Sequence, residues 1–160
     1  LVYAGKVAYK YKGTMPNNTS IVLKEGTLGI AGSAFYNCSG LTSITIPNSV
    51  KSIGNYAFQG CTELRNITIP DGVTSIDDYA FDGCTRLSSI IIPDSVTSIG
   101  YKALDNTIWY SNRPNGLVYA GKIAYKYKGN MGTTTEISFK EGTLSIADYA
   151  FYDCSNLAKI

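Results

Sequence analysis

The sequence contains no histidine, few charged residues and no long apolar run. Ser-His-Asp and Cys-His nucleophile systems need an imidazole base, and most transition-metal sites use imidazole as a ligand, so composition excludes both classes. Charged residues make up only 16% of the 160 residues, with 14 Lys and Arg against 12 Asp and Glu. A nucleic-acid-binding surface is typically basic, so we expect no DNA or RNA partner.

Membrane-spanning and targeting signals are also lacking. No apolar stretch approaches the roughly 18–20 residues that cross a bilayer, and the chain opens at Leu1 on a β-prone motif rather than on a charged segment followed by an apolar one. We therefore expect no membrane span here, and we expect any signal peptide or anchor to lie outside this fragment.

Cysteine is scarce, and its spacing argues against metal sites and disulfides. The four cysteines are Cys38, Cys61, Cys84 and Cys154, and the first three are each 23 residues apart. A zinc site would show close pairs such as C-x-x-C, and a disulfide scaffold would have more cysteines for its length. The spacing instead predicts one structural position repeated, with buried free thiols. We expect no metal and no cofactor.

What the sequence does contain is a repeat. LTSITIPNSVKSIGNYAFQGCTE, from residue 41, is followed at once by LRNITIPDGVTSIDDYAFDGCTR, and these 23-residue copies are identical at 14 positions. The recurring positions are apolar, and most changes fall on polar positions between them. A period of 20–29 residues that begins L-x-x-L-x-L is typical of leucine-rich repeats, in which each coil adds one strand to a shared parallel sheet.

A second, longer period frames these coils. LVYAGKVAYKYKG at 1–13 recurs as LVYAGKIAYKYKG at 117–129, and residues 1–41 and 117–157 agree at 28 of 41 positions. Two β-prone runs flank Ala-Gly in each copy, which predicts a hairpin with one packed face and one wet face. We predict a single array over 1–160, with hairpins at 1–13 and 117–129 and coils from about 18, 41, 64, 87 and 134.

Within a coil, three elements are expected. The first strand ends at Ile-Pro (Pro47, Pro70 and Pro93), because proline cannot donate the next ladder hydrogen bond. V-x-x-I predicts a second short strand, and A-F-x-x-C predicts a tight helical turn that places Phe in the core. The fold class is thus a repeat solenoid of leucine-rich repeats, mainly β, with a parallel sheet and short helical turns, interrupted by β-hairpin segments.

LTSITIP, V-x-x-IG, YAF and GC at a period of 23, with the interposed LVYAGK-AYKYKG hairpin, resemble the BspA-like leucine-rich repeat family of bacterial surface antigens. The resemblance covers essentially the whole chain. It implies a secreted or surface-attached protein, and a partner such as fibronectin or fibrinogen or a protein of another cell. Leu104 and Thr107, in the coil from 87, depart from the Phe and Cys of this pattern.

The favoured function is a non-enzymatic protein-binding or adhesion module. Parallel strands stacked about 4.8 Å apart present a ribbon of side chains with fixed spacing. With Ile44 and Ile46 pointing inward, the outward positions of three successive coils are the candidate protein-binding residues: Ser43, Thr45, Asn66, Thr68, Ser89 and Ile91. The alternative is a structural stalk, spacer or self-association repeat without a ligand of its own.

Two weaker possibilities stay open. Asp71 and Asp94 share a phase in adjacent coils, so they could lie near the roughly 5 Å separation of a retaining glycosidase pair, but Asp is also an ordinary turn residue. We do not expect an enzyme. The hairpin tyrosines and lysines could form an external contact strip, although aromatic hairpin faces usually pack on their own scaffold.

Overall fold

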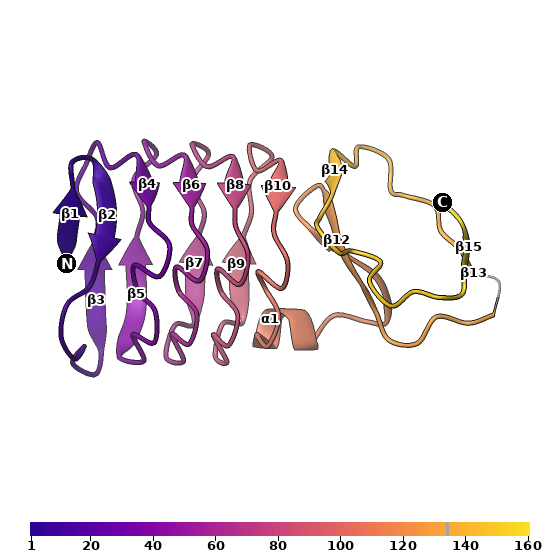
Figure 1. Cartoon of the computed structure of the whole chain (residues 1–160), viewed down its shortest axis with the longest axis horizontal. Coiled ribbons are helices and arrows are strands. Elements are labelled where there is room, and N and C mark those ends of the chain that lie inside the picture. Colours follow the sequence, from indigo (N-terminus) through magenta and orange to yellow (C-terminus); the bar gives the residue numbers. More distant parts are fainter. Residues whose placement is uncertain (134) are drawn as a thin grey trace.

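The structure, a computed structural model, describes residues 1–133 and 135–160 and is an elongated β-solenoid (Figure 1). The first hairpin lies at one end and the last coil at the other, so the coils stack along the long axis. The predicted start of the last coil, residue 134, lies outside the described residues.

Fifteen short strands and one short helix make up the described chain. In chain order they are β1 (Val2–Ala4), β2 (Val7–Lys10), β3 (Thr19–Val22), β4 (Gly29–Ile30), β5 (Leu41–Thr45), β6 (Ser52–Ile53), β7 (Asn66–Thr68), β8 (Ser75–Ile76), β9 (Ser89–Ile91), β10 (Ser98–Ile99), α1 (Ile108–Ser111), β11 (Gly116–Ala120), β12 (Ile123–Lys128), β13 (Thr135–Glu136), β14 (Ser145–Ile146) and β15 (Leu157–Lys159).

The longest sheet is built from the V-x-x-I strands. Its order is β1-β2-β4-β6-β8-β10; β1 and β2 form an antiparallel hairpin, and every later pair is parallel. Each parallel partner is the equivalent residue of the neighbouring coil, as in Ile53 opposite Ile76. The hairpin therefore covers one end of the sheet.

The L-x-x-L-x-L strands form a second row, but this row is not one continuous sheet. β3 pairs with β5, β7 with β9 and β13 with β15, each pair parallel. β5 lies beside β7 without sharing a ladder with it. The shared sheet that the sequence predicted at these strands is therefore divided into pairs, and the continuous ladder runs through the V-x-x-I strands instead.

A stack of phenylalanine rings fills the interior of the first three coils. Phe58 packs face to face between Phe35 and Phe81, with ring centroids 5.1 and 5.2 Å apart. All three rings are fully buried. The predicted Phe plug is therefore confirmed, and the regular spacing of the rings reflects the constant rise from coil to coil.

Tight turns carry these rings, and their backbone amides alternate between two kinds of bond. Ala57 N–H closes a turn on Gly54 O at 3.1 Å, whereas Phe58 N–H donates to Ala80 O of the next coil at 2.8 Å. Tyr56 adopts a left-handed backbone with φ 59°. These segments thus tie neighbouring coils together even though they contain no β-strand.

The coil from residue 87 keeps its packing despite its two departures. Leu104 and Thr107 are buried where the other coils have Phe and Cys. The Thr107 hydroxyl donates to Leu104 O at 2.7 Å and accepts from Tyr110 N–H at 3.1 Å, which caps the N-terminus of α1. The change from Cys to Thr therefore starts a helix turn that leads out of the coil.

The second hairpin corrects one prediction. Ile123 and Tyr125 are buried on one face of β12, but Ala124 on the other face is buried too. Both faces are covered because the face with Tyr119 and Ala124 meets the following coil at Lys140, while the face with Tyr125 meets the coil from 87. The expected wet face is absent in this copy, and the tyrosines pack on their own scaffold.

The four cysteines are free, and three of them are buried: Cys38, Cys61 and Cys84. Burial, with a smaller contribution from Cys61, raises the pKa of Cys38 to about 11. The Cys61 and Cys84 thiols donate to Phe35 O and Phe58 O, each at 3.1 Å. Cys154 departs from the prediction because it is only half-buried, in a last coil that is covered on one side.

We expect thiol titration to separate these positions. At pH 8 a thiol of pKa about 11 is roughly 0.1% thiolate, and the thiolate is the reactive form. In native protein an aromatic disulfide reagent should modify Cys154 only, whereas four equivalents should react in denaturant without reductant. Fewer than four equivalents in denaturant would contradict the free-thiol ladder.

Candidate protein-binding surface

Alternation along β5, β7 and β9 brings the predicted residues to the surface. Ile44, Ile67 and Ile90 point into the core and are buried. All six outward residues are exposed: Ser43, Thr45, Asn66, Thr68, Ser89 and Ile91. Cross-strand register places Asn66 beside Ser89 and Thr68 beside Ile91. The outward positions therefore form a row across neighbouring coils.

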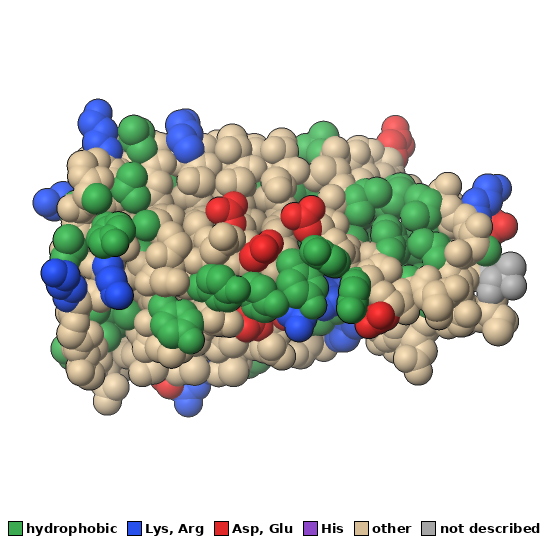
Figure 2. Space-filling model, viewed as in Figure 1, with side chains coloured by type: hydrophobic (Ala, Val, Ile, Leu, Met, Phe, Trp, Pro, Cys, Tyr) green, Lys and Arg blue, Asp and Glu red, His purple; other side chains and the backbone are tan. Residues whose placement is uncertain are grey.

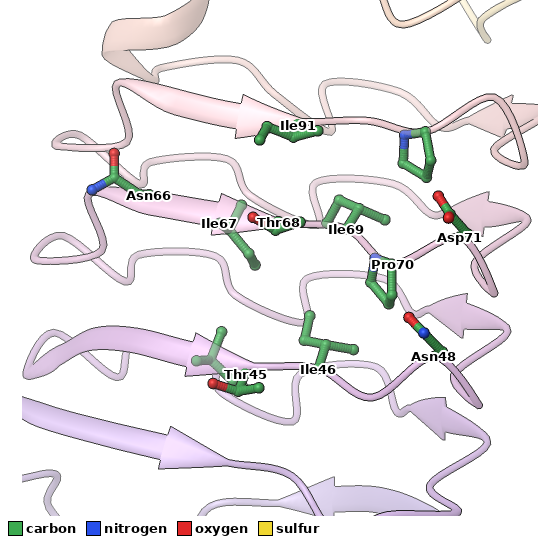
Figure 3. A pocket seen from close by; sticks show the side chains of 12 residues that line it. Thr45, Ile46, Asn48, Asn66, Ile67, Thr68, Ile69, Pro70, Asp71 and Ile91 are labelled. Carbon is green, nitrogen blue, oxygen red and sulfur yellow. The ribbon is translucent and has the colours of Figure 1, made fainter.

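A groove opens where the strand row is divided. It has a volume of about 530 Å³ and lies along β5, β7 and β9, on the side where β5 and β7 share no ladder. Figure 3 shows Thr45 and Ile46 on one side of it and Ile67, Thr68 and Ile69 on the other. Its lining residues are Ile44, Thr45, Ile46, Asn48, Asn66, Ile67, Thr68, Ile69, Pro70, Asp71, Ile91 and Pro93.

The groove combines an apolar base with polar groups at its margins. Ile46, Ile69 and Pro70 are largely buried and supply the base. Asn48 and Asp71 are exposed and lie together beyond Pro70, on the side away from Asn66 (Figure 3). An apolar side chain of a partner can contact the base while the Asn and Asp groups hydrogen-bond to its backbone, which is a common combination at protein interfaces.

Four of the six predicted residues line this groove: Thr45, Asn66, Thr68 and Ile91. Ser43 and Ser89 lie on the same exposed row outside it, and the Ser43 hydroxyl is 2.5 Å from that of Ser20. Sequence reasoning missed the contribution of Ile46, Ile69 and Pro70. The available signal was the Ile-Pro pair itself, which ends each first strand beside this opening.

Two exposed apolar residues stand at opposite ends of the row. Ile91 is 60% exposed on β9, and Val22 is 74% exposed on β3. Val22 lies in register with Thr45, and Thr68 lies in register with Ile91. Ile91 is therefore not a lone apolar residue in a polar row, and a partner that spans the four strands meets an apolar contact at each end.

The carboxylates that could have formed a catalytic pair have different surroundings. Asp94 forms an ion pair with Lys122 of the second hairpin, with an O to N distance of 2.5 Å, whereas Asp71 lies at the groove. Among residues 1–133 and 135–160, no group of three or more His, Cys, Asp or Glu side chains is arranged to hold a metal ion. Of the two carboxylates, Asp71 therefore belongs to the groove and Asp94 to the contact with the second hairpin.

A second aromatic feature follows the turn segments. Figure 2 shows hydrophobic side chains in a band along the middle of one face, with acidic side chains beside it. Tyr56 and Tyr79 stack at 5.0 Å, and Tyr101 meets Tyr79 edge-on at 5.4 Å. Because these rings pack on one another, the row joins successive coils.

No helix in the described part of the chain has both the length and the apolar character to cross a bilayer. The strands described above form a solenoid of short parallel strands, with a groove on one side and a hairpin inserted between coils.

These features are those of a leucine-rich repeat scaffold. The family model described as the BspA type leucine-rich repeat region matches residues 7–131 and 121–160 in six copies. The chain belongs to this BspA type leucine-rich repeat family. The resemblance and the solenoid class that the sequence indicated are thereby confirmed.

Solved structures of similar proteins agree with this assignment. A leucine-rich repeat protein of T. pallidum is 27% identical, with a TM-score of 0.57 over 94% of this chain and 60% of that one. A leucine-rich repeat protein from Bacteroides ovatus is 28% identical, with a TM-score of 0.61 over 86% of this chain and 36% of that one. This chain thus spans less than two thirds of either protein. No curated protein matches it.

Proposed function

We propose that this chain is a non-enzymatic protein-binding module of a secreted or surface-attached protein. Its partner is an extracellular-matrix protein, such as fibrinogen or fibronectin, or a surface protein of another cell. The leucine-rich repeat family supports a role in protein interaction, and the resemblance to bacterial surface antigens supports the location and the partner class.

The groove along β5, β7 and β9 is the observation that carries the proposal. Its base of Ile46, Ile69 and Pro70 can accept an apolar side chain, and Thr68 and Ile91 stand at its margin. The row continues outward to Ser43 and Ser89, so a partner has a surface several strands wide. Interface energy concentrates in a few contacts of this kind, surrounded by polar ones.

Charge placed in the groove should therefore weaken binding. We expect the double variant Thr68→Glu, Ile91→Glu to retain its far-UV circular dichroism and to lose at least about tenfold in affinity, or about 1.4 kcal/mol, for fibrinogen or fibronectin. The two carboxylates would lose hydration against an apolar partner surface, and Glu at position 91 removes the apolar contact. A binding titration of variant and wild type side by side measures the change.

The matched control is Thr85→Glu, Ser98→Glu, which adds the same charge at exposed positions away from the groove. It should bind as the wild type does. Equal affinity of both folded double variants would exclude the groove. Absence of binding by the wild type to either matrix protein would remove this partner class and favour a stalk or spacer role.

A further inference from the structure

The two hairpins are nearly identical in sequence and differ in what covers them. Residues 1–13 and 117–129 share 12 of 13 residues, with Val7 opposite Ile123 as the one change. Tyr125 is 2% exposed, whereas its counterpart Tyr9 is 53% exposed. Val118 and Ala120 are likewise buried, and their counterparts Val2 and Ala4 are not. One face of the first hairpin is therefore open where the second is packed.

The contacts of each hairpin with the coil that follows it are the same. Ala31 N–H donates to Ala8 O, and Ala147 N–H donates to Ala124 O, both at 2.9 Å. The Tyr3 hydroxyl accepts from Lys24 N–H at 3.0 Å, and the Tyr119 hydroxyl accepts from Lys140 N–H at 2.9 Å. The difference in burial thus arises wholly on the opposite face.

In the second hairpin, that opposite face binds the end of the coil from residue 87. The Tyr125 hydroxyl donates to the Asp105 carboxylate at 2.8 Å and accepts from Leu104 N–H at 2.9 Å. Lys126 Nζ forms an ion pair with the same carboxylate at 2.5 Å. Asp105 is 8% exposed, so it is a buried anion held by a phenol and an ammonium group.

Further contacts extend this interface over the helix turn. Lys128 Nζ donates to Ser111 O at 2.6 Å and to Arg113 O at 2.5 Å. The Trp109 and Tyr110 rings meet Tyr125 edge-on, with centroids 6.5 and 5.9 Å away. The hairpin therefore recognises a particular coil end: a buried Asp, an aromatic helix turn and outward carbonyl groups.

The first hairpin carries the same recognition groups without a partner coil. Tyr9, Lys10 and Lys12 correspond to Tyr125, Lys126 and Lys128, and all three are exposed. Figure 2 shows basic side chains gathered at the end of the molecule where β1 and β2 lie. An open apolar strip flanked by lysines is complementary to a coil end that presents one carboxylate and several backbone carbonyl groups, as the end of the coil from 87 does.

We propose that the open face of β1–β2, formed by Val2, Ala4, Tyr9, Lys10 and Lys12, is a docking surface for a second copy of the 116-residue unit. The coil end at 103–113 of that copy occupies the surface, with its Asp105 between Tyr9 and Lys10. Units then join through the same contacts that link the coil from 87 to the second hairpin, and the solenoid extends by whole units.

The test joins residues 1–116 to the N-terminus of the full chain, which recreates the junction between Gly116 and the following Leu. Amide hydrogen exchange is measured by mass spectrometry on the tandem protein and on the single chain. We expect amides of the internal β1–β2 hairpin to exchange at least tenfold more slowly in the tandem than in the single chain, and as slowly as those of β11–β12.

Two variants make the test specific. Tyr9→Phe in the internal hairpin of the tandem should restore faster exchange there, whereas Tyr9→Phe in the single chain should change nothing. Asp105→Lys in the added unit should also make the amides of the internal β1–β2 hairpin exchange faster. The β11–β12 hairpin should stay protected in this variant, and it serves as the internal reference. Fast exchange of the internal hairpin in an otherwise protected tandem would overturn the proposal. So would loss of protection at both hairpins, because the added unit would then not fit the face.

Discussion

Replacing Phe58 by alanine is expected to lower the free energy of unfolding by about 3–5 kcal/mol, the usual cost of deleting a buried aromatic ring. The ring is fully buried and stacked on Phe35 and Phe81 on both sides. Its loss leaves a cavity in the middle of the stack, which the backbone cannot close because hydrogen bonds between coils fix their separation. Denaturant unfolding followed by circular dichroism measures the change.

The control for this variant is Thr85→Ala, an exposed change in the turn after Cys84, which should alter stability by less than about 0.5 kcal/mol. A Phe58→Ala protein as stable as the Thr85→Ala protein would mean that the aromatic stack is not part of the core.

Replacing Asp105 by alanine is expected to cost about 3 kcal/mol, because it leaves a buried hydroxyl and a half-buried ammonium group without their acceptor. The Tyr125 hydroxyl and Lys126 ammonium both donate to this carboxylate. Removing one member of a buried ion pair typically costs about 3–5 kcal/mol, and Lys126 is partly exposed, which favours the lower end. Burial and the nearby carboxylate raise the pKa of Tyr125, so its hydroxyl stays protonated as a donor.

Asp105→Asn separates charge from hydrogen bonding, since the amide oxygen can still accept from Tyr125. We expect it to lose less stability than Asp105→Ala, with both measured by denaturant unfolding. Equal losses would indicate that the ion pair with Lys126 is the whole contribution. No loss in either variant would contradict the assigned role of Asp105 in the interface between coil and hairpin.

The repeated core could be predicted from the sequence because it depends on local pattern. Val50, Ile53, Ala57, Phe58 and Cys61 recur 23 residues later, and each member of both sets is buried. A period that preserves apolar positions fixes which side chains point inward, whatever the details of each turn. The same pattern located the outward row, because alternate residues of a strand face opposite ways.

The groove could not be predicted in the same way. Its position depends on which neighbouring strands share a ladder. β7 pairs with β9 but not with β5, although all three strands have similar sequences. A residue pattern therefore identifies the exposed row but gives no reason for an opening at one step and not the next.

The hairpins show a second limit. Tyr9 and Tyr125 sit in almost identical segments, yet one is exposed and the other is buried. The local sequence is nearly the same, so the difference in exposure comes from the coil from 87, which packs against Tyr125 and has no counterpart at Tyr9. The predicted packed tyrosine face is right for β12, where Asp105 and Trp109 cover Tyr125, and wrong for β2, where Tyr9 is exposed. The covering residues are distant in sequence from the tyrosine, so the hairpin pattern alone could not distinguish the two copies.

The direction of the hydrogen bonds between coils has a mechanical consequence. Strands run across the long axis in Figure 1, so these bonds point along it, and tension applied to the two ends loads them lengthwise. A terminal coil can then detach without disturbing its inner neighbours. Each 23-residue coil occupies about 5 Å in the stack and extends to about 80 Å when pulled out. Under tension the solenoid would therefore lengthen in steps of about 75 Å, one coil at a time.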